Sequence, residues 1–474
     1  MLLSDLLAKT THLGVVNFKQ KEVLDIVSDS RKCKPGSIFA SLGGANFRAG
    51  EFISDAKKNG AVAVLTDDEN LASKIAENAI ICDNARKTMA EIAKCLCTAD
   101  LEKMSLIAVT GTKGKTTTSL CLHHILERSG VCSVSIGTLG CIGKVLPPTE
   151  SSINTTPESC ELYRVLGDAF GAGARVGVIE VSSQALITYR TLGIPFKIGI
   201  FTNLSEDQIG YLEHPSYEDY YAAKRSLFRD YGIGLAFLNS RDGMAKHIAK
   251  GVPERVFVLP EYLPPKREGF SSFSLDGKSY EVYGGSYNSD NAALAVSAAR
   301  RAFGIDERII ADALSTFRAE GRFESYSYRG ARIFIDYAHN ADSVRAVLSS
   351  VRAFTKGKII AVIGSVGNRS KNRRASLGEV CERYADITVI SSDNPDFESP
   401  EAIAAEIHSA FKDKSKATVI TDRADAIIHA ISLSRSSDSV VLLGKGHERF
   451  QLVRGERLPF SERALILAMG ATEN

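Results

Sequence analysis

The sequence predicts an α/β protein in which short buried strands alternate with helices along most of the chain. Two observations carry this prediction. In the last third of the chain, five β-branched runs alternate with helical periods, which is the pattern of a parallel, doubly wound sheet. Further upstream, an apolar run at residues 105–110 leads directly into a glycine-rich loop and then into a helix.

The expected elements fall into three regions, which we place at residues 1–100, 101–318 and 319–474. The first two regions have strands expected at 37–42, 61–66, 79–82, 105–110, 176–181, 198–203 and 235–239, and helices at 117–129 and around 220–228. The third has strands expected at 331–335, 358–363, 387–390, 417–420 and 439–443, and helices at 342–354, 400–411 and 423–433. The Pro- and Gly-containing residues 260–269 and 284–285 are predicted to be surface loops.

Composition excludes several classes of protein. The 58 basic and 56 acidic residues leave a net charge of +2, without the basic excess of a nucleic-acid binder. No stretch approaches the roughly 18 apolar residues of a membrane span, and the N-terminus does not have the pattern of a secretory signal. The nine cysteines are odd in number and irregularly spaced, which argues against a disulfide framework or a zinc site. We therefore expect a cytoplasmic enzyme that binds neither nucleic acid nor membrane.

The segment G-T-K-G-K-T-T at residues 111–117 is a candidate phosphate loop. Its glycines let backbone N–H groups point at phosphate oxygens, and the helix that follows presents its positive end. Lys115 can reach the β/γ-phosphates and the Thr116 hydroxyl can bind Mg²⁺. The alternative is a glycine-rich turn with a solvated lysine. The candidate ATP-binding residues of the loop are Gly111, Thr112, Lys113, Gly114, Lys115, Thr116 and Thr117.

This short loop resembles that of the ATP-dependent Mur ligases of peptidoglycan synthesis, and further motifs follow in the family's order. They are S-D-S-R at 28–31, N-T-T-P-E at 154–158, E-V-S-S at 180–183, F-T-N-L-S at 201–205, Y-A-A-K at 221–224, G-R-F-E at 321–324, D-Y-A-H at 336–339, D-N-P at 393–395 and G-K-G-H-E at 444–448. Each motif is weak alone, but together they are specific. The chain resembles the members that add the third amino acid to UDP-MurNAc-L-Ala-D-Glu, in a pathway of cell wall biogenesis, cell shape and division.

The resemblance implies a small α/β nucleotide-sugar domain, a central P-loop ATPase-like domain and a C-terminal doubly wound, Rossmann-like domain that binds the amino acid. It implies an ADP-forming reaction through an acyl phosphate, with UDP-MurNAc-dipeptide, ATP and an amino acid as partners, and a monomer. Lys115 and Glu180 would act on the phosphates and Mg²⁺. In similar enzymes the lysine matching Lys224 is carbamylated by CO₂ and becomes an anionic metal ligand; without the resemblance, Lys224 is a solvated helix lysine.

One departure from the family pattern lies near the expected metal. After N-L-S the family usually has Asp-His, whereas this chain has Glu206-Asp207-Gln208. Either His214 replaces the missing imidazole, or Gln208 does so through its amide oxygen. A second position that is commonly His is Gln184.

The match also places the substrate contacts. The uridine end would be bound by Ser28, Ser30, Gly44, Ala45 and Asn46, and the dipeptide by Asn154, Thr155, Thr156, Ser182 and Arg190. Thr155 and Thr156 also have the pattern of a helix N-cap before Pro157. The ATP base, ribose or phosphates would be contacted by Asn288, Arg322, Asp336 and His339, with a surface salt bridge as the alternative for Arg322.

The acceptor amino acid would bind Arg374, Asp393, Asn394, Gly444 and Glu448. In relatives that add diaminopimelate, the residue after D-N-P is an arginine, which pairs with the distal carboxylate. Here it is Asp396, which repels a carboxylate and attracts an ammonium. The hypothesis is an acceptor with a cationic side chain, L-lysine first and ornithine second; the alternatives are meso-diaminopimelate, with Asp396 facing solvent, or a divergent ligase with another substrate.

Two hypotheses place the chain in other classes of protein. A small-molecule P-loop kinase would share the phosphate loop but would have no evident use for Lys224 or the D-N-P and G-K-G-H-E motifs. A non-catalytic nucleotide-binding subunit would account for Gln184 and Gln208 at positions often held by histidine.

Overall fold

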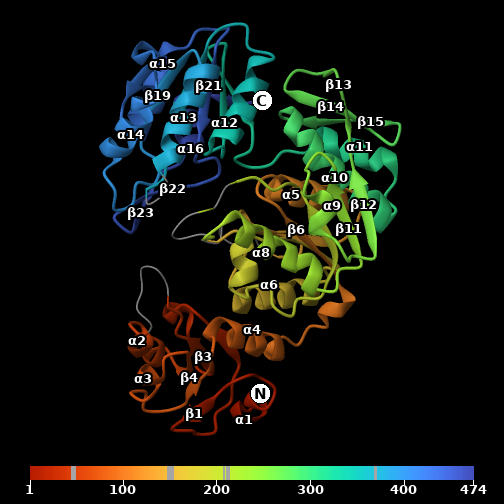
Figure 1. The fold of residues 1–474 in the computed structure, drawn as a ribbon, viewed down its shortest axis with the longest axis vertical. Coiled ribbons are helices and arrows are strands. Elements are labelled where there is room, and N and C mark those ends of the chain that lie inside the picture. The colour runs from red at the N-terminus through yellow and green to blue at the C-terminus, as the bar shows by residue number, and fades with distance from the viewer. Residues whose placement is uncertain (44–49, 147–153, 207–208, 210–213, 368–370) are drawn as a thin grey trace. The chain divides into compact units, whose positions relative to one another are not determined.

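The computed structural model describes the whole chain except residues 44–49, 147–153, 207–208, 210–213 and 368–370. The chain forms two compact units, whose residues can be located in Figure 1 with the colour bar. One unit contains Met1–Leu259 and Leu294–Asp306, and the other contains Pro260–Ala293 and Glu307–Asn474. The domain boundaries expected from the sequence stay a prediction.

The first sheet has the strand order β1-β5-β4-β3-β2 and is parallel except at β1, which pairs antiparallel with β5. Its strands are β1 (Gly14–Val16), β2 (Asp25–Val27), β3 (Ser37–Ala40), β4 (Ala61–Thr66) and β5 (Ala79–Ile81). Its helices are α1 (Leu3–Leu7), α2 (Ile53–Lys58), α3 (Glu69–Ala72) and α4 (Ala85–Leu96). The three strands expected in this region are all present, slightly shorter at two of their ends.

The second sheet of this unit has the order β12-β11-β10-β6-β9-β7-β8, with only β8 antiparallel to its neighbour. Its strands are β6 (Ser105–Thr110), β7 (Ser133–Gly137), β8 (Gly140–Ile142), β9 (Val176–Glu180), β10 (Phe196–Phe201), β11 (Leu235–Asn239) and β12 (Glu254–Val258). The helices between them are α5 (Lys115–Arg128), α6 (Ser159–Gly171), α7 (Ser183–Ile187), α8 (Tyr217–Asp230) and α9 (Ala245–Ile248). Strand β6 lies between β9 and β10, so the loop that follows it opens at the middle of the sheet.

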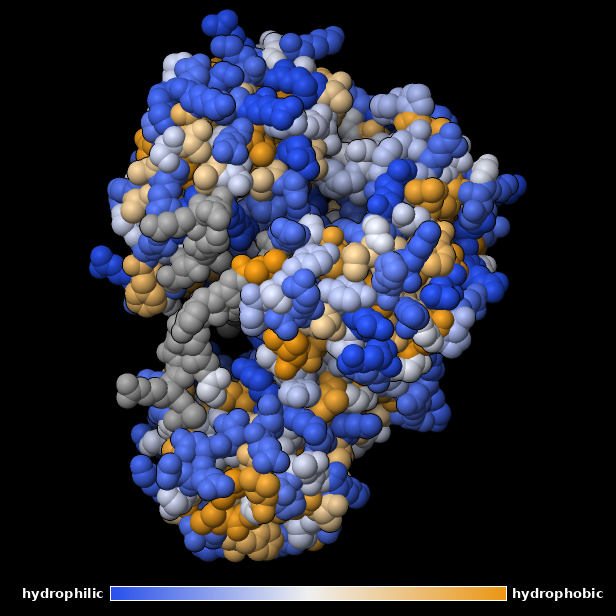
Figure 2. Space-filling view, viewed as in Figure 1, coloured by the Kyte–Doolittle hydropathy of each residue, from blue (hydrophilic) through white to orange (hydrophobic). Residues whose placement is uncertain are grey.

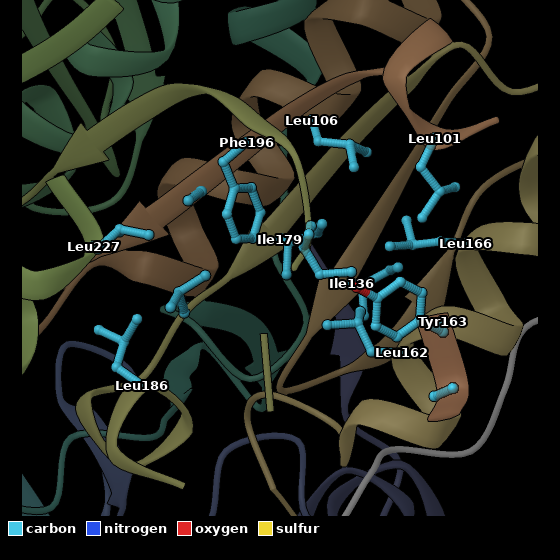
Figure 3. Packing of buried hydrophobic residues seen from close by; sticks show 14 of the residues in the cluster. Leu101, Leu106, Ile136, Leu162, Tyr163, Leu166, Ile179, Leu186, Phe196 and Leu227 are labelled. Atoms are coloured by element: carbon cyan, nitrogen blue, oxygen red, sulfur yellow. The ribbon is translucent and has the colours of Figure 1, made fainter. Parts of the chain in front are cut away.

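The continuous apolar runs of these strands are buried because helices cover the sheet, as expected for parallel strands. Figure 3 shows part of this core. Leu106 of β6 and Ile179 of β9 lie near Leu162 and Leu166 of α6, and Phe196 of β10 lies toward Leu227 of α8. This packing fixes the carboxyl ends of β6, β9 and β10, where the phosphate loop and its neighbours lie.

The second unit begins with an antiparallel sheet of β13 (Glu261–Leu263), β14 (Phe270–Leu275) and β15 (Lys278–Tyr283). The prediction that 260–269 is only loop is therefore wrong, since β13 lies within it. The neighbouring hairpin of β14 and β15 had a signal in the sequence: Asp276-Gly277 is its two-residue connection, in which both residues have positive φ, 51° and 75°. Such an Asp-Gly pair is typical of a type I′ hairpin turn. Helix α10 (Ser286–Phe303) follows Gly284 and Gly285, and α11 (Glu307–Thr316) comes next.

The C-terminal sheet has the order β20-β19-β18-β21-β17-β16-β24. The five predicted parallel strands form its core, as β17 (Ala331–Asp336), β18 (Ile359–Ile363), β19 (Ile387–Ile390), β20 (Ala417–Val419) and β21 (Ser439–Leu443). Two antiparallel strands were not predicted, β16 (Glu324–Tyr328) next to β17 and β24 (Thr472–Glu473) at the edge of the sheet. A hairpin of β22 (Phe450–Val453) and β23 (Glu456–Pro459) follows β21.

Helices cover both faces of this sheet, which confirms the doubly wound prediction. One face packs against α12 (Ala341–Arg352), α13 (Lys371–Tyr384) and α14 (Pro400–Ser409). The other face packs against α15 (Arg423–Leu433) and α16 (Glu462–Ala468). In Figure 1 these helices flank the strands of the blue-coloured sheet.

In the described part of the chain, no helix combines the length and apolar character needed to cross a membrane. Hydrophilic residues cover most of the face seen in Figure 2, and hydrophobic residues are interspersed among them.

Candidate active site

The phosphate loop joins β6 to α5, as the sequence predicts. Gly111 has φ 148° and Gly114, the N-cap residue of α5, has φ 82°. A Cβ atom on Gly111 would lie 1.9 Å from Oγ1 of Thr202, so this position has no room for a side chain. Residues after β10 hold the loop: Thr202 Oγ1 and Asn203 Nδ2 donate hydrogen bonds to the Lys113 carbonyl over 2.6 and 3.0 Å.

Lys115, the first residue of α5, folds back over the loop. Its Nζ donates hydrogen bonds to the carbonyls of Gly111 (2.9 Å) and Thr112 (3.1 Å). Thr112 Oγ1 lies 2.9 Å from the Tyr220 hydroxyl and accepts a hydrogen bond from the Ser205 backbone N–H over 3.0 Å. The lysine is therefore held at the loop, which rejects the alternative of a solvated lysine on a turn.

Glu180, the last residue of β9, is 2% exposed and faces the start of α5. Its Oε2 accepts hydrogen bonds from Thr116 Oγ1 (2.8 Å) and Thr138 Oγ1 (3.2 Å), and its Oε1 accepts one from the Thr138 backbone N–H (2.9 Å). Gly137 permits this geometry, because a Cβ atom there would lie 2.0 Å from Glu180 Oε1. Hydroxyl and carboxylate oxygens are ligands that Mg²⁺ prefers, so this set fits the expected ion.

No group of three His, Cys, Asp or Glu side chains with metal-binding geometry occurs among the residues that the structure describes. A Mg²⁺ ion held by a hydroxyl, a carboxylate, water and phosphate oxygens does not require such a group.

Lys224 lies in α8 and is fully buried, so the alternative of a solvated helix lysine is wrong. Its Nζ donates a 2.9 Å hydrogen bond to the Gly111 carbonyl and lies 4.7 Å from the ring centre of Tyr220. The helix begins after Ser216, whose hydroxyl accepts the N-capping hydrogen bond from the Asp219 backbone N–H. Residues 113 positions apart in the sequence thus meet at the phosphate loop.

His214 is also buried beside this group. Its Nε2 lies 2.8 Å from Ser183 Oγ, and its ring centre is 5.1 Å from that of Tyr220. Burial lowers the pKa of His214, and the nearby positive charge of Lys224 lowers it further. The imidazole is therefore neutral at pH 7, the form that binds metals. Gln208, the other candidate, lies outside the described residues.

The dipeptide candidates lie around the backbone of Glu180. Thr156 Oγ1 donates to the Glu180 carbonyl (2.7 Å) and accepts from the Ser182 backbone N–H (3.0 Å). Arg190 donates to the Thr156 carbonyl (3.2 Å) and pairs with Glu158, its Nε 3.2 Å from Oε1.

Thr155 Oγ1 accepts a 3.3 Å hydrogen bond from Thr138 Oγ1, and Asn154 is partly exposed. The helix that follows begins at Ser159 with Glu158 as its N-cap residue, so the expectation that Thr155 or Thr156 caps it is wrong.

The nucleotide-sugar candidates are only partly described. Ser28 lines a cavity of about 300 Å³ bordered by β2, α4 and α6, together with Cys160 and Glu158. Ser30 is buried, and its carbonyl accepts a 2.9 Å hydrogen bond from Asn59 Nδ2. The residues Gly44, Ala45 and Asn46 lie outside the described part of the chain.

In the second unit, Asp336 ends β17 with a buried carboxylate. It accepts hydrogen bonds from the backbone N–H groups of Phe323 (2.8 Å) and Ala338 (2.7 Å), and burial raises its pKa. Arg322 lies over the Tyr337 ring at 4.6 Å and donates to the Gly321 carbonyl.

The two remaining ATP candidates contact backbone carbonyls. His339 Nδ1 is 2.8 Å from the Tyr337 carbonyl oxygen, and buried Asn288 donates to the Tyr283 carbonyl over 3.0 Å. Both side chains are thus held by local contacts within their own unit.

The acceptor candidates Asp393, Asn394, Gly444 and Glu448 meet at the carboxyl ends of β19 and β21. Asn394 Nδ2 donates a 2.8 Å hydrogen bond to Glu448 Oε2. Gly444 has φ 109°, and a Cβ atom there would lie 2.5 Å from Asp393 Oδ2. Lys445, which the sequence analysis did not assign, donates to both Asn394 Oδ1 (2.9 Å) and Glu448 Oε2 (2.8 Å).

Arg374 is not part of this cluster in the structure. It is buried, and its guanidinium makes a bidentate pair with Glu398 (2.6 and 2.7 Å) and a third contact with Glu406 (3.0 Å). Its role in binding the acceptor carboxylate stays a prediction.

Asp396 is half-buried with φ 52° and lies beside the β22–β23 hairpin. Its Oδ1 accepts a 2.8 Å hydrogen bond from the Gly455 backbone N–H, and its own backbone N–H donates to the Leu452 carbonyl over 3.0 Å. The hairpin therefore holds the Asp396 side chain through one of its two carboxylate oxygens. Its role as a selector of the acceptor stays a prediction.

Sequence reasoning missed Thr138 and Lys445. Thr138 directly follows β7, so the rule that ligand-binding residues lie at the carboxyl ends of parallel strands could have found it. Lys445 lies inside the G-K-G-H-E motif, between Gly444 and Glu448, which the sequence did assign to the site. A cationic side chain next to an expected carboxylate was the signal that could have identified it.

A strand, a glycine-rich loop and a helix that begins Lys-Thr, beside a buried carboxylate, define an enzyme that uses a nucleoside triphosphate. Three family descriptions match the chain in order: "Mur ligase family, catalytic domain" over residues 23–98, "Mur ligase middle domain" over 109–261, and "Mur ligase, glutamate ligase domain" over 321–446. The chain belongs to the Mur ligase family, and it is an ATP-dependent ligase that uses Mg²⁺.

Curated relatives match nearly the whole chain. The UDP-N-acetylmuramoyl-L-alanyl-D-glutamate–2,6-diaminopimelate ligase of Aquifex aeolicus is 33% identical over 95% of this chain and 94% of its own. The corresponding L-lysine ligase of Streptococcus thermophilus is 34% identical over 91% of this chain and 90% of its own. A solved structure of a 2,6-diaminopimelate ligase of this type matches with a TM-score of 0.60 and 26% identity, covering 94% of both chains.

Proposed function

We propose that this enzyme joins an amino acid to UDP-N-acetylmuramoyl-L-alanyl-D-glutamate in peptidoglycan precursor synthesis, with ATP converted to ADP and phosphate. The similarity to named ligases over more than 90% of the chain supports the substrate. The observation that carries the chemistry is the hydrogen bond from Thr116 to Glu180 beside the phosphate loop. It places two hard oxygen ligands where Mg²⁺ would accompany the ATP phosphates.

The first step is transfer of the γ-phosphoryl group. A carboxylate oxygen of the dipeptide attacks the γ-phosphorus, and the bond to the β-phosphate oxygen breaks to release ADP. Lys115 stabilises the charge on the phosphate oxygens, and the backbone N–H groups of the loop bind them. Thr116 and Glu180 would hold Mg²⁺, which neutralises phosphate charge when bound.

Lys224 would act as a carbamate. Its amine lies at the loop carbonyl of Gly111, and a positive charge so close to the expected Mg²⁺ would oppose metal binding. Reaction of the neutral amine with CO₂ forms an N–C bond and releases a proton, leaving an anionic oxygen ligand. We propose neutral His214 as the imidazole of this site in place of the residue missing after N-L-S.

In the second step the acceptor amine, bound as an ammonium, first loses a proton to water and then attacks the acyl carbon. Phosphate leaves with the bridging oxygen, and the second proton lost from nitrogen passes to the phosphate or to water. Asp393, Asn394 and Glu448 would bind the acceptor's α-amine, because two carboxylates, that of buried Asp393 and that of partly exposed Glu448, lie beside the Asn394 amide. Arg374 would bind its carboxylate after leaving Glu398 or Glu406. Asn288, Arg322, Asp336 and His339 would complete the ATP contacts, and Ser28, Ser30 and residues 44–46 those of the uridine end.

We propose L-lysine as the acceptor, with ornithine second, because Asp396 presents a carboxylate where a distal ammonium is expected. Its Oδ1 is anchored by Gly455, which orients the group. We further propose a cytoplasmic monomer with domains at 1–100, 101–318 and 319–474.

The test is phosphate release from ATP with UDP-MurNAc-dipeptide and, in parallel, L-lysine, ornithine, meso-diaminopimelate or no amine. Release that depends on lysine is expected. Release that depends on diaminopimelate would retain the ligase and reject the acceptor assignment. Equal release with and without amine would overturn the ligase in favour of another phosphate-transfer activity.

A further inference from the structure

We propose that Lys445 is a positioning residue. It sets the net charge of the site that binds the acceptor's amine, and it holds the side chains of Glu448 and Asn394 in fixed positions. This inference deepens the proposed function and rests on it. Lys445 follows Gly444 at the end of β21 and is fully buried.

The ammonium of Lys445 connects two loops that are distant in sequence. It donates to Asn394 Oδ1 in the loop after β19 (2.9 Å) and to Glu448 Oε2 in the loop after β21 (2.8 Å). Asn394 in turn donates to the same Glu448 oxygen over 2.8 Å. Three polar groups thus fix one another, and the carboxylate expected to bind the amine cannot rotate without breaking two hydrogen bonds.

The same ammonium lies 3.6 Å from Oδ1 of Asp393, which is 2% exposed. Among the described residues this oxygen accepts no hydrogen bond, although buried carboxylate oxygens are normally satisfied. It is therefore a candidate acceptor for an N–H group of the incoming amino acid.

Asp393 and Glu448 each carry one negative formal charge and Lys445 carries one positive charge, so these three groups together have a net charge of −1. The buried pair of Arg423 and Glu462 behind the loops is neutral as a pair. A net charge of −1 matches one α-ammonium, whereas without Lys445 the two carboxylates would repel each other and Glu448 would lose the hydrogen bond that holds it.

The test compares Lys445→Met, Lys445→Arg and a control on an exposed lysine of the same unit, Lys412→Met. Two readouts are taken: ligation as a function of acceptor concentration, and trapping of the acyl phosphate with hydroxylamine, a small neutral nucleophile that does not need the amine site. We expect Lys445→Met to raise the acceptor KM at least tenfold, and the ratio of ligation to trapping to fall at least tenfold. Lys445→Arg retains the charge and should show a smaller change of threefold to tenfold.

An acceptor KM of Lys445→Met within twofold of the wild-type value would overturn the proposal. So would an equal loss of trapping and ligation, because that points to a general structural role. If circular dichroism shows that Lys445→Met does not fold, the acceptor KM of Lys445→Arg is the deciding measurement. An unchanged acceptor KM in Lys445→Arg would overturn the proposal. Failure of the wild-type enzyme to form any hydroxamate would instead overturn the proposed function, and this inference with it.

Discussion

Glu180 Oε2 at the end of β9 accepts a 2.8 Å hydrogen bond from Thr116 Oγ1 in the first turn of α5. The two residues are 64 positions apart, and both are buried. Their approach depends on Gly137, whose missing side chain leaves the space that the Glu180 carboxylate occupies.

Gly137→Ala is therefore expected to lower amine-dependent phosphate release without removing any polar group. A Cβ atom 2.0 Å from Glu180 Oε1 must displace the carboxylate. Misplacement by about 1 Å commonly costs on the order of a hundredfold in rate. The control is Gly171→Ala at the end of α6, where no atom lies within 4 Å of the added Cβ. Equal activity of the two variants would contradict the prediction.

Lys224 should carry CO₂ in the active enzyme. With ¹³C-bicarbonate, the wild-type protein is expected to show a carbamate carbonyl resonance that Lys224→Ala lacks. Because removing one group that stabilises developing charge typically costs about a hundredfold to a thousandfold, ligation should fall by that order. Lys246→Ala, an exposed lysine in α9, serves as the control. A resonance that persists in Lys224→Ala would assign the carbamate elsewhere.

Asp396 should determine the use of lysine. Asp396→Asn is the sharper substitution, because asparagine tolerates the left-handed φ of 52° and can still accept the hydrogen bond from Gly455. We expect kcat/KM for lysine to fall about tenfold, the equivalent of losing about 1.4 kcal/mol of charge attraction. Asp396→Arg should depress lysine use further, since like charges facing each other cost several kcal/mol. Unchanged lysine use in both variants would show that Asp396 does not contact the acceptor.

The buried pair of Arg423 and Glu462 should be a major contributor to the stability of the C-terminal sheet. Arg423 donates to Glu462 Oε1 (2.7 Å) and to the carbonyls of Ser392 (3.1 Å) and Leu443 (2.7 Å). Arg423→Met leaves Glu462 buried without its partner, and such losses cost about 3–5 kcal/mol. Urea unfolding measures this. The double variant with Glu462→Leu should recover part of the stability, and no recovery would argue that the backbone contacts dominate.

His123 in α5 should make the free energy of unfolding depend on pH. Burial lowers its pKa from 6.5 to about 4, so the folded state favours the neutral ring, which lies 2.8 Å from Ser133 Oγ. Its contribution is complete above pH 6.5 and is lost as the pH falls toward 4, with a slope of up to about 1.4 kcal/mol per pH unit. His123→Gln should flatten the curve of unfolding free energy against pH in this range, and an unchanged slope would contradict the prediction.

Much of the fold follows from local pattern. The run at 105–110 followed by G-T-K-G-K-T-T predicted β6, the loop and α5 because hydrophobic burial, glycine conformation and helix initiation all act within about 25 residues. Strand β24 was not predicted because it pairs with β16, nearly 150 positions away in the sequence. Strand β16 forms a local hairpin with β17 instead, and its turn at Arg329-Gly330, where both residues have positive φ, was a signal that was not used. The hairpin of β14 and β15 was not predicted although its Asp276-Gly277 turn is typical of a hairpin, because this local signal was not used.

For the site, the sequence by itself determined the chemical groups: a phosphate loop, the carboxylate of Glu180, the amine of Lys224 and the polar D-N-P and G-K-G-H-E motifs. The tertiary structure alone decided which of them meet. Lys224 is a buried partner of Gly111 rather than a solvated lysine, Arg374 pairs with Glu398, and Lys445 joins Asn394 to Glu448. The reason is physical: burial and charge pairing depend on contacts between strands and helices that are remote in sequence, and no local pattern encodes these contacts.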